Sequence, residues 1–419
     1  MALILKLSSG IIIEVGTDKT SILTVNAGSS SIKLVLFTAN TSDGSYERLL
    51  EASVTGIGQA SCSLNTRQLP NQANKQNIEA HDHALAVQIL MDWFHQFSPE
   101  TDLSLIGHRV VHGGATYSQP QLITDQVVTS LEALSSLDPE HMPFTLLLIH
   151  NLRLHYPNIP QVACFDTAFF HNLPEQATIL PIPRKFEASG LRRYGFHGLS
   201  YTYLMSAFRD TAGKDAVNGR VIYAHLGSGA SLTATKNGKP MDTTMGFSPT
   251  SGIMMSSRSG DIDPSIALFL HRQHGMNFDE FNHMVNFESG LLGVSELSAD
   301  MLTLLQHEAS NKKASDAVNL FVYQVKKAIG SLTTTIGGLD SLVFSGGIGE
   351  QSASLRARIC DGLDYLGVGI DDDDNQKHSE LISAPHSKVG VHVIPTDEAK
   401  VIASESLHIF MTHIKGEPS

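Results

Sequence analysis

Short runs of β-branched and apolar residues alternate along the chain with longer stretches in which apolar residues recur at the helical period. This alternation is typical of α/β architecture. The pattern predicts strands at Ser21–Val25, Ile32–Phe37, Leu103–Val110, Gln161–Phe165, Arg220–Ala224, Ser231–Thr235, Ser341–Phe344 and Val391–Ile394. It predicts helices at His83–Phe97, Asp125–Leu137, Ser200–Thr211, Leu302–His307 and Ser352–Leu363.

The strongest helical pattern lies between Ser315 and Ile336, with Ser315 as its candidate cap and Gly337 as its predicted end. A strand, a glycine-rich turn and a second strand occur at Ser21–Phe37 and again at Arg220–Thr235, which is a weak internal symmetry. The length of 419 residues favours two domains, and a cleft between two domains is the default place to expect a site.

The bulk composition excludes several classes of protein. A net charge of −13 argues against a surface that attracts nucleic acid or anionic lipid. No apolar run reaches the roughly 18 residues that a membrane-spanning helix needs. Cys62, Cys164 and Cys360 lie far apart, so neither a disulfide framework nor a zinc site is indicated, and a reducing cytoplasm fits best. Residues 1–20 lack the features of an export signal, and we interpret them as an extra strand or a disordered lead.

Three glycine-rich turns are candidates for phosphate binding. In the first, Asn26 to Lys33, small hydroxyl residues join two strands and Lys33 adds a positive charge; a plain β-hairpin is an equal alternative. The second turn, His225 to Ser231, has the same character. The third, Gly346–Glu350, follows a strand and precedes a helix, so its N–H groups can meet a ribose or a phosphate. A glycine-rich turn of this third kind also arises for steric reasons alone.

Two arginines are candidate anion-binding residues. Arg109 ends a strand beside a glycine turn, and Arg258 lies among small residues, with Asp261 as a candidate partner that holds it in place. The planar guanidinium suits a carboxylate or a phosphate because it can bond two oxygens at once. The spacing of His108 and His112 invites a zinc interpretation, but no third ligand is near in sequence.

Acids and a histidine complete the set of candidates. Asp166 ends a strand, where site residues are common in open α/β sheets. His197 is framed by glycines, although a lone loop histidine is more often structural. The segment Thr396-Asp397-Glu398 marks a strand-to-helix junction, and a helix cap is the competing interpretation there. Consecutive acids at Asp371–Asp374 predict a solvated loop.

Taken together, these segments resemble the acetate kinase family, in the same order and spacing from about Ile22 to about Ser404. The resemblance implies the fold of the sugar kinase, actin and Hsp70 superfamily: α/β, two ribonuclease H-like domains with mixed sheets flanked by helices and a cleft between them. It implies an extra N-terminal segment at 1–20, an acyl-kinase domain of 21–165 plus 398–419 closed by the C-terminal helix, and a nucleotide-binding and dimerisation domain at 166–397.

The resemblance also implies an activity and partners. Members of the family use ATP and Mg²⁺ to convert acetate reversibly to acetyl phosphate and ADP, as homodimers. It implies that Arg109 and Arg258 hold the acyl carboxylate and the transferring phosphoryl group. It implies catalytic roles for Asp166, His197 and His141, and a small acyl pocket formed by Val111, Phe196 and Pro249. Asn26 and Glu398 match the positions that organise magnesium.

The implied nucleotide contacts lie in four segments. They are Lys33; His225, Leu226, Gly227, Ser228 and Gly229; Asp300, Met301 and Leu302; and Gly346, Gly347, Ile348, Gly349 and Glu350. In the third segment the family's Asp-x-Arg is here Asp-Met-Leu, so the arginine that could stack on the base is missing. Weaker ATP affinity, or use of another nucleoside triphosphate, is then an alternative.

Two further departures concern the acid and the metal. The family's Pro-Leu-His-Asn-Pro is here Pro139-Glu140-His141-Met142-Pro143, which puts a carboxylate near the expected acyl pocket. The family's Thr-Asn-Glu-Glu is here Thr-Asp-Glu-Ala, which keeps the first glutamate, Glu398, and loses the second. A propionate- or butyrate-type kinase is therefore an alternative, and a non-catalytic ATP clamp is a rival of a different class.

Overall fold

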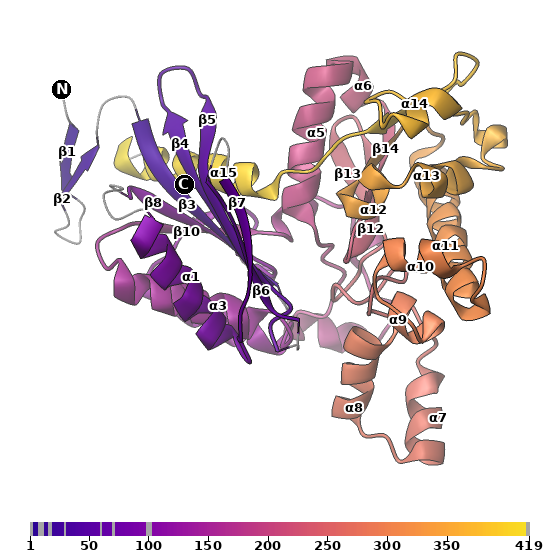
Figure 1. Ribbon diagram of the computed structural model, residues 1–419, viewed down its shortest axis with the longest axis horizontal. Helices are drawn as coiled ribbons and strands as arrows, with labels where there is room; N and C mark the ends of the chain where they lie inside the picture. Colours follow the sequence, from indigo (N-terminus) through magenta and orange to yellow (C-terminus); the bar gives the residue numbers. More distant parts are fainter. Residues whose placement is uncertain are drawn as a thin grey trace. The chain divides into compact units, whose positions relative to one another are not determined.

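The computed structural model describes residues 3–6, 12–15, 19–28, 31–58, 61–68, 72–97 and 103–415 (Figure 1). The chain forms two compact units. Unit 1 comprises Met1–Ala168 and Asp397–Ser419, and unit 2 comprises Phe169–Thr396. Ser29 and Ser30 of the first predicted turn, and half of the segment 1–20, lie outside the described residues.

Unit 1 is built on a mixed sheet with the strand order β7-β6-β5-β4-β3-β8-β10-β9. Strand β3 pairs in parallel with β8, and β8 in parallel with β10, while the other neighbours are antiparallel. The strands are β3 (Lys19–Ala27), β4 (Ser31–Asn40), β5 (Tyr46–Thr55), β6 (Ser63–Gln68), β7 (Gln72–Asn77), β8 (Leu105–Val110), β9 (Gln121–Leu122) and β10 (Gln161–Phe165). The carboxyl ends of β3, β8 and β10 therefore meet at one edge of the sheet.

Helices cover both faces of this sheet. Helices α1 (His83–Phe97) and α3 (Met142–His155) share one apolar core with β3 and β4 (Figure 1). Helix α15 (Glu398–Lys415) packs on the other face, where β8 has a glycine. A Cβ atom on Gly107 would lie 2.4 Å from Ser406 Oγ, so only glycine lets α15 approach this closely. Helix α2 (Asp125–Ala133) continues into a 3₁₀ turn at Leu134–Ser136.

Two short strands lie in the N-terminal segment. Strand β1 (Leu3–Lys6) pairs antiparallel with β2 (Ile12–Val15). An extra strand was one of the two interpretations of residues 1–20. The paired strands agree with that interpretation for the residues described.

Unit 2 is built on a mixed sheet with the order β13-β12-β11-β14-β15. An antiparallel hairpin, β11–β12, is followed by the parallel strands β14 and β15. The strands are β11 (Arg220–Leu226), β12 (Ala230–Lys236), β13 (Lys239–Thr243), β14 (Ser341–Ser345) and β15 (Gly390–Val393).

The two faces of this sheet carry different helices (Figure 1). Helices α5 (Gly198–Ala212) and α6 (Lys214–Asn218) share a core with β11 and β14. Helix α11 (Lys312–Ile336) packs against β11, β12 and β13. The remaining helices are α4 (Glu175–Thr178), α7 (Ser265–His274), α8 (Phe278–His283), α9 (Gly290–Ser295), α10 (Met301–His307), α12 (Gly346–Gln351), α13 (Ala353–Cys360) and α14 (Asp372–Gln376), with 3₁₀ turns at Ala168–Phe170, Arg184–Ser189 and Asp364–Leu366 and a π turn at Met284–Glu288.

The predicted α/β architecture with mixed sheets is confirmed, but two local predictions are wrong. Helix α11 is capped by Asn311, whose side chain accepts hydrogen bonds from the N–H groups of Lys313 and Ala314, and not by Ser315. The helix begins with Lys312 and Lys313, which are polar. The apolar pattern in the sequence therefore starts about one turn after the helix does. The acids 371–374 do not form a loop: Asp371 caps α14, and the other three lie in its first turn, where the helix dipole favours negative charge.

Two further observations bear on the composition. Cys62, Cys164 and Cys360 are buried free thiols. Among the residues described, no helix combines the length and apolar character needed to cross a membrane.

Candidate active site

Three predicted site residues of unit 1 stand at the carboxyl ends of its three parallel strands. Asn26 is the penultimate residue of β3, Arg109 the penultimate residue of β8, and Asp166 follows β10 directly. The register pairs Cys164 with Arg109 and Val25 with His108, which brings these strand ends level. The sequence predicted that site residues lie at the ends of these strands. The strand pairing places Asn26, Arg109 and Asp166 at the same edge of the sheet.

Arg109 is the centre of a hydrogen-bonded network. It donates to one carboxylate oxygen of Asp166 from Nη2 at 2.6 Å and from Nε at 3.1 Å. It donates from Nη1 to Asn26 Oδ1 at 3.1 Å. Asp166 is fully buried, and the Arg109 side chain is 15% exposed. These three hydrogen bonds fix the guanidinium in one orientation. Removing Arg109 or Asp166 would be costly, because the remaining charge would be buried without this partner.

Glu398 joins the same network through Asn26. The Asn26 amide donates to Glu398 Oε2 at 3.0 Å while its oxygen accepts from Arg109. Burial alone would lower the pKa of Arg109, but the carboxylates of Asp166 and Glu398 outweigh that effect and hold the pKa above its ordinary value. Arg109 therefore keeps its positive charge at any physiological pH.

The neighbouring acid, Asp397, has a different role. Its carboxylate caps α15 by accepting from the N–H group of Lys400 at 3.0 Å, and it pairs with Arg48 at 2.5 Å. The helix-cap interpretation is thus correct for Asp397. Glu398, one residue later, points its carboxylate to Asn26 instead.

His141 stands at the start of α3 and is oriented by an acid that the sequence analysis missed. Its Nδ1 donates to a carboxylate oxygen of Asp138 at 2.9 Å, and both side chains are buried. This bond leaves Nε2 as the atom available to a ligand. The spacing of an acid three residues before the histidine, at a helix start, is the signal that could have identified Asp138.

The other histidines of this region are neutral and structural. Burial lowers the pKa of His108 to about 4, and this histidine bonds the side chain of Gln161 at 2.7 Å. Burial likewise lowers the pKa of His112 to about 4, and its Nδ1 accepts from the N–H group of Gly114. Among the described residues, no group of three or more histidine, cysteine, aspartate or glutamate side chains forms a metal-binding cluster. Val111, which precedes His112, is buried.

Lys33 lies on β4 directly opposite Asn26 in the β3–β4 register, and its side chain is exposed. The hairpin interpretation of this turn is correct for the backbone. The positive charge of Lys33 nevertheless stands across from the residue that connects Arg109 to Glu398.

In unit 2, His197 lies in a strained, enclosed position. It has the left-handed conformation, with φ 61°, at the start of α5, and its Nδ1 is 2.9 Å from Ser231 Oγ. A Cβ atom on Gly229 would lie 2.9 Å from His197 Nε2, so the second glycine turn needs this glycine to accommodate the imidazole. A left-handed non-glycine residue is costly and is found mainly at functional sites.

His225, the penultimate residue of β11, lies beside His197, with ring centroids 4.7 Å apart. Its Nδ1 is 2.8 Å from Ser200 Oγ, which in turn is 2.8 Å from Thr396 Oγ1. Sequence reasoning gave no role to Ser200, Ser231 or Thr396, although Ser231 ends the second glycine turn and Thr396 begins the Thr-Asp-Glu segment. Only the folded chain assembles these hydroxyl groups around the two histidines.

Arg258 is half-buried and approaches the same turn. It donates from Nη1 to the carbonyl of Pro249 at 2.9 Å, and a Cβ atom on Gly229 would lie 3.8 Å from its Nη2. The prediction that Asp261 holds Arg258 is wrong, because the Asp261 carboxylate accepts from the N–H group of Gly252 and closes the loop. Phe196 and Pro249, of the predicted acyl pocket, are both buried.

The second and third glycine turns meet. A Cβ atom on Gly227 would lie 3.9 Å from the backbone nitrogen of Gly347, at the start of α12. The Glu350 carboxylate closes the third turn by accepting from the N–H groups of Gly346 at 2.8 Å and Thr396 at 3.2 Å. Backbone N–H groups at a helix start beside a glycine turn form the kind of site that binds phosphate.

The third predicted nucleotide segment has mixed surroundings. Asp300 caps α10 by accepting from Thr303, and Met301 is buried in the core. Leu302 is 63% exposed and Asp300 is exposed as well, so two of the three side chains are accessible to a ligand.

Comparison with known proteins places these arrangements in a family. The Acetokinase family matches residues 21–404. An acetate kinase of Rhodopseudomonas palustris (strain ATCC BAA-98 / CGA009) is 43% identical over 393 residues, covering 91% of this chain and 96% of that protein. A propionate kinase of Citrobacter rodentium (strain ICC168) is 41% identical over 394 residues, covering 93% of this chain and 96% of that protein. The crystal structure of a propionate kinase from Francisella tularensis subsp. tularensis SCHU S4 superposes with a TM-score of 0.85 at 33% identity, covering 93% of this chain and 100% of that chain. The chain therefore belongs to the acetokinase family.

Proposed function

We propose that this protein is a magnesium-dependent kinase that reversibly transfers the γ-phosphoryl group of ATP to acetate, giving acetyl phosphate and ADP. The observation that carries this proposal is the network of Asn26, Arg109, Asp166 and Glu398 at the strand ends of unit 1. It presents an oriented cation together with carboxylate and amide oxygens, which is what phosphoryl transfer to a carboxylate requires.

The reaction needs charge stabilisation more than covalent chemistry. A bond forms between an acetate oxygen and the γ-phosphorus, and the bond from that phosphorus to the leaving oxygen of ADP breaks. We assign Arg109 to the acyl carboxylate and Arg258 to the transferring phosphoryl group. His197, with Nδ1 engaged by Ser231, is assigned to stabilise the transition state through Nε2. His141, whose Nδ1–H donates to Asp138, presents Nε2 to a ligand as an acceptor in the neutral ring and as a donor only in the imidazolium.

The oxygen donors present fit magnesium. Asn26, Asp166 and Glu398 supply amide and carboxylate oxygens, and Mg²⁺ typically keeps several waters and uses only one or two carboxylates besides substrate phosphates. When bound, the ion would neutralise charge on the phosphates. The chain's own part is to hold those oxygens in place, through the bonds from Arg109 to Asp166 and from Asn26 to Glu398.

We assign nucleotide binding to unit 2 and acyl binding mainly to unit 1. The meeting of the turns at Gly227 and Gly347 supports the first assignment. Lys33 is a phosphate contact implied by the family resemblance alone. Leu302 replaces an arginine that could stack on a base, so weaker ATP affinity or use of another nucleoside triphosphate is part of this proposal. Three buried free thiols fit a reducing cytoplasm as the location.

The acyl substrate is chosen among acetate, propionate and butyrate. Relatives at similar identity are named acetate kinase and propionate kinase. Buried Val111, Phe196 and Pro249 support a short apolar acyl group. One methylene is worth only about 1–3 kcal/mol of discrimination, so propionate and butyrate remain the alternatives to acetate.

An ADP-release assay with acetate, propionate and butyrate tests the proposal, run with and without Mg²⁺. We expect the highest kcat/KM with acetate and no turnover without the metal. Asp166→Asn serves as the inactive control. Release of ADP that does not depend on any of the acids would favour an ATP clamp instead.

We also propose that the protein is a homodimer that uses the outer face of α7 and α8. Helix α7 has no buried residue, yet Leu268 is 50% and Phe269 is 60% exposed, and Phe278 at the start of α8 is 84% exposed. Large apolar side chains exposed on two successive helices favour an interaction surface there. Light scattering should give twice the mass of the chain for the wild type and a monomer for Leu268→Asp with Phe269→Asp. The matched control, Leu154→Asp, changes a leucine of α3 that is 79% exposed and should leave the dimer intact.

A further inference from the structure

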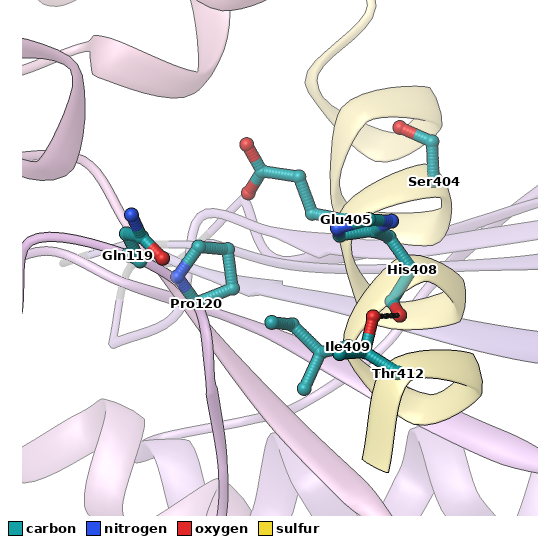
Figure 2. A pocket seen from close by; sticks show the side chains of 7 residues that line it. All are labelled: Gln119, Pro120, Ser404, Glu405, His408, Ile409 and Thr412. Carbon is teal, nitrogen blue, oxygen red and sulfur yellow. Dashed lines mark hydrogen bonds between the residues drawn. The ribbon is translucent and has the colours of Figure 1, made fainter. Parts of the chain in front are cut away.

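Hydroxyl groups in this protein form hydrogen bonds of two kinds. On α15, Thr412 lines a pocket of unit 1 and donates to the carbonyl of His408, one turn back along the same helix (Figure 2). Local bonds of this kind are ordinary in helices. Around His197 in unit 2, hydroxyl groups from α5, β12 and β13 bond to one another instead, and the chain that they form ends on the imidazole.

The hydroxyl groups of this chain share one face of the sheet of unit 2. Ser231 and Thr233 are two residues apart on β12, and Thr243 lies directly opposite Thr233 on β13. Side chains two apart on a strand point to the same side, and the Tyr201 hydroxyl reaches that side from α5. All four residues are buried. Each of their protons must therefore be given to an acceptor inside the protein.

The direction of the chain is fixed at its far end. Thr243 donates its one hydroxyl proton to the carbonyl of Leu232 at 3.0 Å, and a carbonyl can only accept. Thr243 Oγ1 in turn accepts from Thr233 at 3.0 Å, which uses the proton of Thr233. In its hydrogen bond with Tyr201, Thr233 is therefore the acceptor, and Tyr201 gives its proton to Thr233.

The same count of protons reaches His197. Tyr201 Oη lies 2.5 Å from Ser231 Oγ, and because the Tyr201 proton goes to Thr233, Ser231 is the donor in this bond. Ser231 then has no proton left for His197 Nδ1, which is 2.9 Å away, and must accept from it. Burial raises the pKa of the Tyr201 hydroxyl well above its ordinary value, so Tyr201 keeps the proton that this order needs. His197 therefore carries a proton on Nδ1.

A proton held on Nδ1 decides what Nε2 can do. A neutral imidazole has one proton, so Nε2 is then an acceptor, and it donates only when the ring is an imidazolium. Nε2 faces the second glycine turn, where a Cβ atom on Gly229 would lie 2.9 Å from it. A phosphoryl oxygen at that turn needs a donor, and an imidazolium supplies a donor together with a positive charge.

We propose that Tyr201 is a positioning residue for His197. Acting through Ser231, it commits Nδ1 to donating, so that His197 donates to the transferring phosphoryl group only as an imidazolium. The effect on the reaction rests on the function proposed above, whereas the order of the hydrogen bonds does not.

The titratable and charged groups that face His197 within the described part of unit 2 come from three places. They are Tyr201 of α5, His225 of β11 and Arg258 at the glycine turn. His225 and Arg258 are unchanged in the variants below, so differences between those variants report on the hydrogen-bond chain.

Nitrogen NMR of the full chain, with ¹⁵N in its histidines, tests the order of the bonds without any turnover. His197→Gln identifies the signals of His197 among the 20 histidines. In the neutral ring of the wild type we expect a protonated Nδ1 and an unprotonated Nε2. Tyr201→Phe frees Ser231 to donate to Nδ1, so about half or more of the neutral ring should carry its proton on Nε2. Tyr223→Phe, which changes another buried tyrosine of the same core, is the matched control and should keep the wild-type pattern.

A second variant acts at the far end of the chain and leaves Tyr201 in place. Thr243→Val keeps the shape of the side chain and removes the acceptor of the Thr233 proton. Thr233 can then donate to Tyr201, Tyr201 to Ser231, and Ser231 to His197, so the proton should again move to Nε2. A circular dichroism spectrum equal to that of the wild type checks the fold of each variant.

The pH dependence of kcat with acetate tests the consequence for the reaction. At a pH where the NMR spectra show a neutral His197, wild-type kcat should lie about 10²-fold below its maximum, as for the loss of one transition-state donor. Tyr201→Phe should lose only about tenfold or less, because Nε2 keeps a proton in the neutral ring.

Three results would overturn the proposal: an unprotonated Nδ1 in the neutral wild type, unchanged spectra in both variants, or an equal fall of kcat in the wild type and Tyr201→Phe. A wild type that gives the expected spectra but does not turn over would confirm the order of the bonds and refute the proposed function alone.

Discussion

The two units share one strand arrangement but carry different chemistry on it. In unit 1 the order β5-β4-β3-β8-β10 places an antiparallel hairpin beside two parallel strands, and in unit 2 the order β13-β12-β11-β14-β15 does the same. The weak repeat seen in the sequence is thus a repeat of topology. Both hairpins turn next to the carboxyl ends of the parallel strands, where open sheets bind ligands.

The residues at these equivalent strand ends differ in kind. Unit 1 has fixed charges, with Arg109, Asp166 and Glu398 in one network. Unit 2 has glycine turns that meet at Gly227 and Gly347, and histidines held by serine hydroxyls. The fold therefore supplies the positions, and the side chains divide the work between charge and hydrogen bonding.

The largest expected effect is the loss of turnover when Arg109 or Arg258 is replaced. Arg109→Ala and Arg258→Ala should each lower kcat about 10²-fold or more, because each removes a charge partner of the transition state. Arg109→Ala should also destabilise unit 1, by about 3 kcal/mol, since it removes the cation that donates two hydrogen bonds to the buried Asp166 carboxylate. Steady-state kinetics and denaturant unfolding measure the two effects.

The double variant Arg109→Ala with Asp166→Asn is the control for this comparison. It removes both charges and should recover part of the lost stability without recovering activity. Near wild-type turnover in either single variant would remove that arginine from the mechanism. An equal loss of stability in Arg258→Ala would contradict the view that buried ion pairing is confined to the strand ends of unit 1.

The next prediction concerns two neighbouring acids of unit 1. Glu398→Ala should raise the Mg²⁺ concentration for half-maximal rate about tenfold, the effect expected when a metal-organising group is lost. Asp397→Ala should leave that concentration unchanged and instead destabilise the start of α15 by about 1 kcal/mol, because Asp397 caps this helix. The reverse outcome would show that the roles of the two acids are exchanged.

Elements with a strong periodic pattern could be predicted from the sequence, and those without one could not. Helix α1 and strand β10 have the predicted bounds. Strands β6 and β7 were missed because they are mostly polar, with Leu64 the only large apolar residue in the two, and are held by cross-strand hydrogen bonds at the edge of the sheet. Helix α3 was missed because it carries a nearly continuous apolar run, which gives no clear helical period.

The candidate site shows the same limit. Arg109, Asp166 and the glycine turns could be identified because each combines a special residue type with a strand end. Ser200 and Thr396 could not, since they are 196 positions apart and become partners only in the folded chain. Asp138 is intermediate, because its spacing from His141 was visible but had no family motif attached to it.

A smaller effect is expected from the buried acid behind the strand ends of unit 1. The folded pKa of Glu405 is about 7, against an ordinary value of 4.5, so the folded state binds more protons between these pH values. Its contribution therefore destabilises the fold progressively as pH rises through this window. Glu405→Gln should raise the free energy of unfolding by about 1 kcal/mol at pH 8, after allowance for partial exposure, and by almost nothing at pH 4. Denaturant unfolding of both proteins at the two pH values measures this, and a gain at pH 4 as large as that at pH 8 would show that ionisation is not the cause.

The smallest expected effect concerns Glu140 and tests whether its negative charge weakens the binding of acetate. Glu140, at a position where the family resemblance implies an apolar residue, lies half-buried in the turn just before α3, between Asp138 and His141. A carboxylate there would repel the carboxylate of acetate and compete with it for Arg109, whereas partial exposure to water screens that effect. We therefore expect Glu140→Leu to lower the KM for acetate only about threefold, as a loss of one screened repulsion would do, and to leave the KM for ATP unchanged. Glu140→Gln, which keeps the shape and removes the charge, should have the same effect if repulsion is the cause. An unchanged KM for acetate in both variants would mean that Glu140 points to solvent, where the start of α3 favours an acid through the helix dipole.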